Sequence, residues 1–366
     1  MRSAYLRTAF GVGVLYALFA AIQTAFLSVA AAIAARRLIL PMLASGEWLE
    51  FPDLFRQMLS DGWISALLVF YVIGMVVGML VGIRVFRAIR GNAVPLEKHS
   101  MRPGQYLLLI PVTFGFWAIG VIPGNITAIL GLDTGTDILT RLFGDLGAAA
   151  WPMWIYTCIG APILEELALR KTLLDRIHVY GHGYAALVSG LLFGLIHGNS
   201  GQFFLAFSVG VLFAVIYLFS GNVAHTIVLH ACINTLVTVP EILRAFGIEA
   251  QPVWNFLLPA IGVAGVVILI LNRKQFFAQL TPSRVPDAHR AVWRNAGMIV
   301  MTILGLLNLV TTDLMMVLLQ LLEEVNLLTL VQLVSTALAV ALVLLLPVFS
   351  KRLTAPPEEA EIVTNP

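Results

Sequence analysis

Long apolar stretches recur along nearly the whole chain, and polar residues gather in the short segments between them. A helix needs about 20 apolar residues to cross roughly 30 Å of hydrocarbon. The stretches do not alternate in polarity as the strands of a membrane β-barrel do, so we expect helices. About ten spans are predicted, near residues 9–33, 63–83, 105–131, 150–169, 184–203, 203–220, 222–240, 253–271, 296–312 and 327–349.

The composition is typical of a protein that resides in a lipid bilayer. Of the 366 residues, 59% are hydrophobic and only 11% are charged, and the mean hydropathy is +0.92. Soluble domains carry about 25% charged residues. The sequence therefore predicts an all-α, polytopic integral membrane bundle of about ten transmembrane helices.

Basic residues predict the topology, because short cytoplasmic loops concentrate Lys and Arg. The predicted inside loops receive Arg84, Arg87, Arg90, Lys98 and Arg102, then Arg170, Lys171 and Arg176, and then Arg273, Lys274, Arg284, Arg290 and Arg294. The first span is too long for a cleaved signal peptide. We expect a cytoplasmic-membrane protein with both termini inside. Its net charge of +2 is dispersed among loops, so no nucleic-acid surface is predicted.

Two glutamates and an arginine interrupt an apolar span in the stretch "PILEELALRK", residues 162–171. A charge at the bilayer centre costs about 2.5–3.5 kcal/mol on insertion scales and usually marks function. Glu166 and Arg170 are four residues apart with the acidic residue first, so they are predicted to pair. Glu165 projects about 100° away and has no helical partner. One glutamate is thus predicted to be structural and the other available for chemistry.

Two later spans add histidines, in "LLFGLIHGNSG" and "VLHACINTLV". Phe193 and His197 share one helical face, as do His230 and Asn234. A lone membrane histidine is more often a hydrogen-bonding residue in helix packing. Polar groups from separate helices, however, are how a membrane-embedded site is assembled. Together with Glu165, the two histidines therefore predict one shared site.

Two kinds of hydrolytic chemistry fit a carboxylate and two imidazoles. A carboxylate with an imidazole deprotonates a water, and a second imidazole with an amide stabilises an oxyanion. The same Glu and His set is also suited to bind Zn²⁺ with an open position for water. Residue spacing leaves this choice open.

These residues resemble the CPBP intramembrane proteases, a family of type II CAAX prenyl endopeptidases and bacteriocin-processing or immunity (Abi) proteins. The family pattern EExxxR, FxxxH and HxxxN occurs here in order. The resemblance implies that Glu165 activates water with the help of His197, supported by Glu166 and Arg170. It further implies that His230 and Asn234 stabilise the oxyanion.

The resemblance also implies a partner and leaves a cofactor open. The substrate is expected to be a peptide or a membrane-anchored protein, with a CAAX-like sequence as one case. Zn²⁺ remains an alternative to a metal-free mechanism, with Glu165, His197 and His230 as its ligands. The expected organisation is an N-terminal extension with two spans (1–104), a CPBP-like core (105–271), a C-terminal extension with two spans (272–350) and a disordered tail (351–366).

Three functions other than an endopeptidase are compatible with parts of the sequence. "GNSG" at 198–201 fits the GxSG of rhomboid serine proteases, but His230 and Asn234 follow Ser200, whereas the rhomboid pair precedes the serine. A proton-coupled transporter would also use intramembrane Glu and His, yet no paired broken helices occur in corresponding halves. A non-catalytic membrane scaffold or immunity protein is the remaining alternative. HExxH and GxGD, the signatures of two other intramembrane protease classes, do not occur in the sequence.

Overall fold

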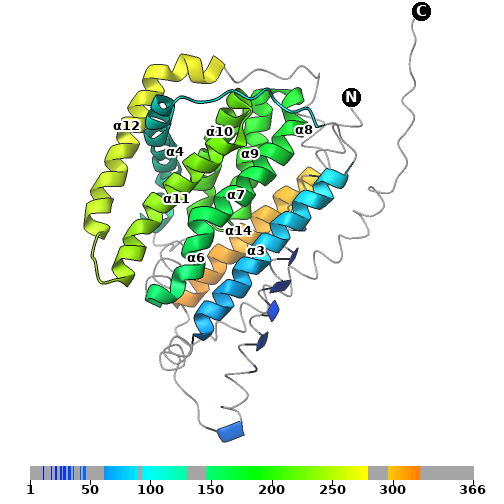
Figure 1. Cartoon of the computed structure of the whole chain (residues 1–366). Helices are drawn as coiled ribbons and strands as arrows, with labels where there is room; N and C mark the ends of the chain where they lie inside the picture. The colour runs from blue at the N-terminus through cyan, green and yellow to red at the C-terminus, as the bar shows by residue number, and fades with distance from the viewer. Residues whose placement is uncertain are drawn as a thin grey trace, which may run out of the picture.

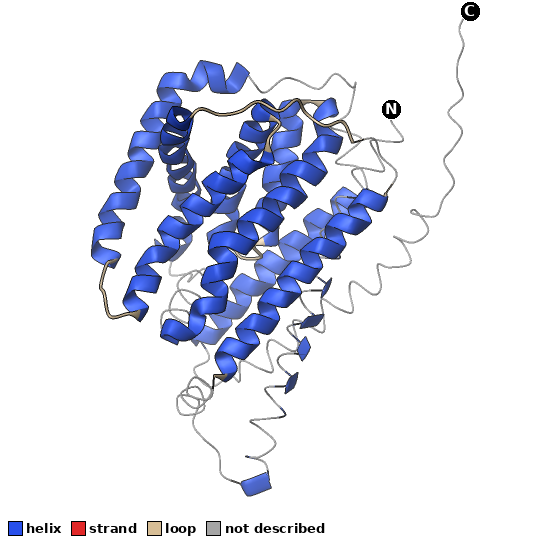
Figure 2. Ribbon diagram, viewed as in Figure 1, coloured by secondary structure: helices blue, strands red, loops and turns tan. Residues whose placement is uncertain are grey.

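The computed structural model describes residues 62–89, 93–129, 146–278 and 296–321, together with scattered positions between 11 and 46. Within these ranges the regular elements are all helical and no strand occurs, which confirms the predicted all-α class (Figure 2). The longer helices are α3 (Trp63–Ala88), α4 (Pro103–Ile129), α9 (His182–Ile196), α10 (Ser200–Ser220), α11 (Val223–Ala245), α12 (Gln251–Ala278) and α14 (Ala296–Leu321), as Figure 1 shows.

Five described helices, α3, α4, α10, α11 and α12, are long and apolar enough to cross a membrane. The chain is therefore a multi-pass integral membrane protein, but the predicted count of about ten spans is not confirmed. The predicted spans at 9–33 and 327–349 fall wholly or largely outside the described residues. So do the tail at 351–366 and the connecting segments 47–61, 130–145 and 279–295.

The predicted span at 150–169 belongs to one helical rod of mixed type that runs from residue 147 to residue 180. Its segments are η1 (Gly147–Ala150), α6 (Trp151–Ile155), η2 (Tyr156–Gly160), α7 (Ala161–Glu166), η3 (Leu167–Leu174), α8 (Asp175–Ile177) and η4 (His178–Tyr180). Segments η2 and η3 are π-helical, and the junction residues keep right-handed helical backbone angles. The rod ends at Gly181, whose φ of +124° is open mainly to glycine.

Small residues let the helices around the rod approach closely. Helix α10 packs against α9 and α4, and α12 packs along α4 (Figure 1). A Cβ added at Gly265 of α12 would lie 1.7 Å from the Pro111 carbonyl oxygen of α4. A Cβ at Gly120 of α4 would lie 2.5 Å from Leu205 Cα of α10. Close backbone contact at small residues is a common way to hold membrane helices together.

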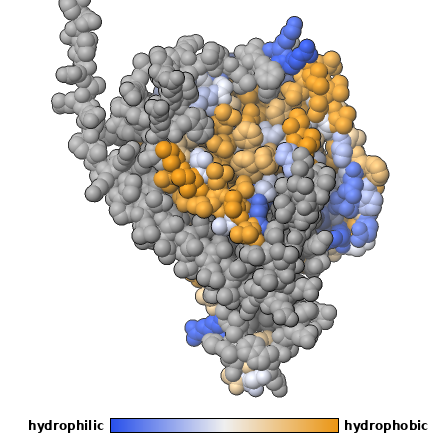
Figure 3. Space-filling view, turned by 180° about the vertical axis from the view of Figure 1, so that it is seen from behind, coloured by the Kyte–Doolittle hydropathy of each residue, from blue (hydrophilic) through white to orange (hydrophobic). Residues whose placement is uncertain are grey.

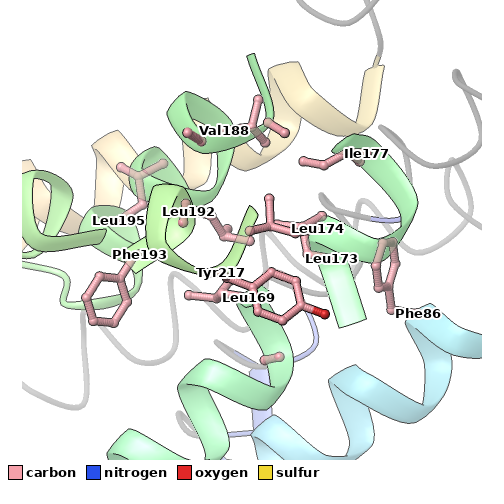
Figure 4. Close-up of a cluster of buried hydrophobic side chains, with 14 of the residues drawn as sticks. Phe86, Leu169, Leu173, Leu174, Ile177, Val188, Leu192, Phe193, Leu195 and Tyr217 are labelled. Carbon is pink, nitrogen blue, oxygen red and sulfur yellow. The ribbon is translucent and has the colours of Figure 1, made fainter. Parts of the chain in front are cut away.

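A buried apolar cluster fixes the rod against α3, α9, α10 and α14 (Figure 4). Leu169, Leu173 and Leu174 of the rod are at most 2% exposed and belong to the same cluster as Phe86 and Tyr217. On the outer surface, by contrast, large hydrophobic side chains are exposed: Phe256 is 81% exposed, Leu271 76% and Leu107 73%. Hydrophobic side chains form a broad region on the face shown in Figure 3, as expected for contact with lipid.

Helix α14, which follows the predicted protease core, packs against α9 and α10. Its Gly305 lies against Leu195, and its Asp313 Oδ1 accepts the backbone N–H of Ser200 at 3.2 Å. Ser200 is the first residue of α10, and the preceding Asn199 side chain accepts the N–H of Gln202 at 2.9 Å. The "GNSG" segment is therefore a turn followed by a capped helix start, and Gly198 adopts a φ of +71° there.

Candidate active site

The two glutamates are the last residues of segment α7. This segment follows the π-helical turn η2, which the sequence did not predict. Glu165 is 7% exposed and Glu166 is 0% exposed. Pro162 stands at the start of α7, and the preceding segment η2 is π-helical. A π-helical turn contains one more residue than an α-helical turn, so it changes which side of the rod the glutamates face.

Glu166 pairs with Arg170, as the sequence predicted. Arg170 Nε lies 3.0 Å from Glu166 Oε2, and neither side chain is exposed. The N–H direction is off the line between these atoms, so the contact is an ion pair rather than an aligned hydrogen bond. Arg170 Nη2 donates to Gly210 O at 3.2 Å, and its guanidinium lies 4.9 Å from the centroid of the Phe193 ring. Arg170 is therefore part of the bundle interior, although the charge pattern grouped it with inside-loop residues.

His230 contacts both glutamates from the facing helix α11. Its Nδ1 lies 3.1 Å from Glu166 Oε1, and its Nε2 lies 3.8 Å from Glu165 Oε2. A carboxylate accepts hydrogen bonds, so the Glu166 contact assigns a proton to Nδ1 and turns Nε2 toward Glu165. The spacing of 3.8 Å is too long for a direct hydrogen bond but suits a bridging water.

His197 joins this cluster through Phe193. It follows the last residue of α9, and its Nδ1 donates to Phe193 O at 2.7 Å. The Phe193 ring meets His197 edge to face at 5.0 Å and His230 edge to face at 5.5 Å. The Phe193 ring thus contacts both imidazoles, and the imidazole that contacts Glu165 is that of His230. The sequence motif contained Phe193 but gave no reason to expect this position.

Asn234 lies one turn beyond His230 on α11 and contacts the rod before the glutamates. Its Nδ2 donates to Thr157 O at 2.9 Å. Sequence reasoning assigned this amide to an oxyanion and missed the carbonyl partner. The signal that could have revealed it is Pro162, because a proline inside a helix leaves a carbonyl without its backbone donor.

The described residues do not form a ready zinc site. No group of three or more His, Cys, Asp or Glu side chains in the described ranges is placed to hold one metal ion. Glu165 and His230 provide two candidate ligands, whereas zinc sites usually take three or four from the protein. Glu166 does support His230 in the way that carboxylates support zinc-bound histidines, a contact that the sequence did not reveal. Two protein ligands are too few for a zinc site of the usual kind.

The fold and this cluster define a class: a multi-pass membrane protein with a carboxylate and imidazole site inside its helical bundle. Residues 147–236 match the family model described as type II CAAX prenyl endopeptidase Rce1-like. All six predicted site residues lie within that segment. This part of the chain is therefore similar to Rce1-like CAAX proteases, in agreement with the resemblance that the sequence motifs indicated.

Two curated bacterial proteins are similar to part of the chain. One is YdiL of Bacillus subtilis (strain 168), whose name assigns it provisionally to the membrane peptidases. It is 25% identical over 175 residues, which cover 44% of this chain and 66% of YdiL. The other is the membrane-embedded CAAX protease MroQ of Staphylococcus aureus (strain USA300), 23% identical over 192 residues, which cover 46% of this chain and 74% of MroQ. No solved structure matches the chain.

Proposed function

We propose that the chain is an intramembrane endopeptidase in which Glu165 activates the water that attacks a peptide bond. The observation that carries this proposal is the buried contact of Glu165 and Glu166 with His230, which joins the rod to α11. Buried ionisable groups that face each other inside a bundle are costly and usually functional. The match to Rce1-like proteases supports a proteolytic use of the cluster.

Glu166 and Arg170 orient the catalytic groups in this proposal. Glu166 has one oxygen beside Arg170 and the other beside His230 Nδ1. This arrangement fixes the ring plane of His230 and the nitrogen that faces Glu165. Oriented groups react faster because the geometry of the reaction is prepared in advance.

Charge balance suggests how the proton moves. With Glu166 and Arg170 both ionised, the remaining pair of Glu165 and His230 is neutral when it shares one proton. When His230 holds that proton, Glu165 is a free carboxylate and accepts a proton from the attacking water. His230 Nε2–H is then a donor for the oxyanion that forms on the substrate carbonyl.

His197 and Asn234 complete the proposed site. Because Nδ1 of His197 donates to Phe193 O, its Nε2 is left as an acceptor that is suited to orient the water. Asn234 uses one N–H for Thr157 O and retains a second for the oxyanion. The substrate class that fits is a peptide or a membrane-anchored protein, with a CAAX-like C terminus as one form.

A comparison of membrane proteomes tests this proposal. Cells that produce the native protein, Glu165→Gln or Ser200→Ala at equal levels are compared for protein fragments with new termini. We expect at least one fragment that disappears with Glu165→Gln and persists with Ser200→Ala, since a general base contributes about 10²–10⁴ in rate. Identical fragments in all three would refute the glutamate mechanism, and a fragment lost only with Ser200→Ala would favour a serine protease.

A further inference from the structure

The carbonyl of Thr157 has no backbone donor within its own helix. In the π-helical segment η2, the N–H of Ala161 donates to Tyr156 O, five residues back. The next bond of that register would run from residue 162 to Thr157 O, but Pro162 has no N–H. The α-helical donor is absent too, because Ala161 is already bonded to Tyr156. An unsatisfied carbonyl inside a membrane is costly, so Thr157 O requires an external donor.

Asn234 supplies that donor from helix α11. Its Nδ2 lies 2.9 Å from Thr157 O. One turn earlier on the same helix, His230 Nδ1 lies 3.1 Å from Glu166 Oε1. Two adjacent turns of α11 therefore contact the two ends of the stretch from Thr157 to Glu166. The proposed base, Glu165, lies between these two contacts.

We propose that Asn234 is a positioning residue whose amide replaces the N–H that Pro162 lacks and thereby maintains the π-helical turn before Glu165. Loss of this turn would rotate the following part of the helix about its axis. If η2 changed from π-helical to α-helical geometry, the chain beyond it would shift by one residue, which is a turn of about 100°. Glu165 would then leave the face that meets His230. This inference rests on the proposed function for its link to catalysis, but the contact itself is testable without any substrate.

Hydrogen–deuterium exchange on the full-length protein in lipid nanodiscs provides that test. The variants are Asn234→Ala, Pro162→Ala and the double variant, with Glu165→Gln as the control that leaves Thr157 O bonded. We expect amides of residues 156–166 to exchange about three- to tenfold faster in Asn234→Ala, since one hydrogen bond is lost. The double variant should regain protection, because Pro162→Ala restores a backbone N–H at that position and so replaces the missing donor. Unchanged exchange in Asn234→Ala, or acceleration that persists in the double variant, would overturn the proposal.

Turnover adds a readout that a purely structural contact would not affect. With a peptide that spans a cleavage site found in the proteome comparison, Asn234→Ala should lower kcat at least tenfold and leave KM within twofold. The loss should be smaller in the Pro162→Ala background. An equal loss in both backgrounds would assign Asn234 to the oxyanion alone and reject the positioning role. If the exchange pattern appears but no Glu165-dependent fragment is ever found, the proposed function fails while the contact between Asn234 and Thr157 stands.

Discussion

Removal of the Glu166 charge should destabilise the bundle far more than removal of the Glu165 charge. Glu166→Gln keeps the side-chain volume but leaves the Arg170 guanidinium, which is 0% exposed, without its anionic partner. Breaking a buried ion pair by neutralising one member costs about 3–5 kcal/mol. The remaining contacts of Arg170, with Gly210 O at 3.2 Å and the Phe193 ring at 4.9 Å, offset part of this loss. We therefore expect about 3 kcal/mol, the lower end of that range.

Glu165→Gln is the matched control for this measurement. Glu165 contacts His230 Nε2 at 3.8 Å, which is beyond hydrogen-bond length, so the expected loss is under about 1 kcal/mol. Thermal unfolding of both variants in detergent is followed by intrinsic fluorescence. It should place the midpoint of Glu166→Gln roughly 3–6 °C below that of the native protein, at about 1–2 °C per kcal/mol for a chain of this size. Arg170→Met added to Glu166→Gln should restore much of the loss, because the double variant no longer buries an unpaired charge. Equal midpoints for the two single variants would refute this account of the charge pair.

Three further predictions concern helix contact, the serine and the metal. Gly265→Ala should lower stability by about 1–3 kcal/mol, because its Cβ would lie 1.7 Å from Pro111 O. The control Gly104→Ala, whose Cβ would have nothing within 4 Å, should leave stability unchanged, and equal unfolding midpoints for the two variants would contradict this. Ser200→Ala should retain cleavage, because the contact of Ser200 with α14 uses its backbone N–H; an inactive variant would revive the serine mechanism. Purified protein should remain active after zinc chelation, and elemental analysis that finds about one zinc per chain, lost in His230→Ala, would contradict this.

Hydropathy predicted the helices well where each span is one regular helix, as in α3 and α11. It failed to describe the rod from 147 to 180, because π-helical segments and internal prolines leave the average hydropathy of a span unchanged. It also said little about α14 beyond its apolar character. The contact of Asp313 with Ser200 joins residues 113 positions apart, and no local pattern reports such a pair.

The candidate site was predictable where its residues interact along one helix. Glu166 and Arg170 are four positions apart, so helical geometry alone predicted their pairing. The position of His230 beside both glutamates depends on how α11 lies against the rod, and sequence spacing has no information on that. The same is true of the contact of Phe193 with both imidazoles. The catalytic roles assigned to all these residues stay predictions.

The capping of α10 by Asp313 of α14 has a consequence for the synthesis of the protein. Because synthesis runs from the N-terminus to the C-terminus, Glu165, His197 and His230 are made well before Asp313. During that interval the start of α10, directly after the turn that carries His197, lacks the carboxylate that accepts the Ser200 N–H. This part of the proposed site is therefore completed only when α14 has been synthesised and has packed against α9 and α10. The nascent chain therefore carries the proposed catalytic side chains before it contains the carboxylate of Asp313 that caps α10.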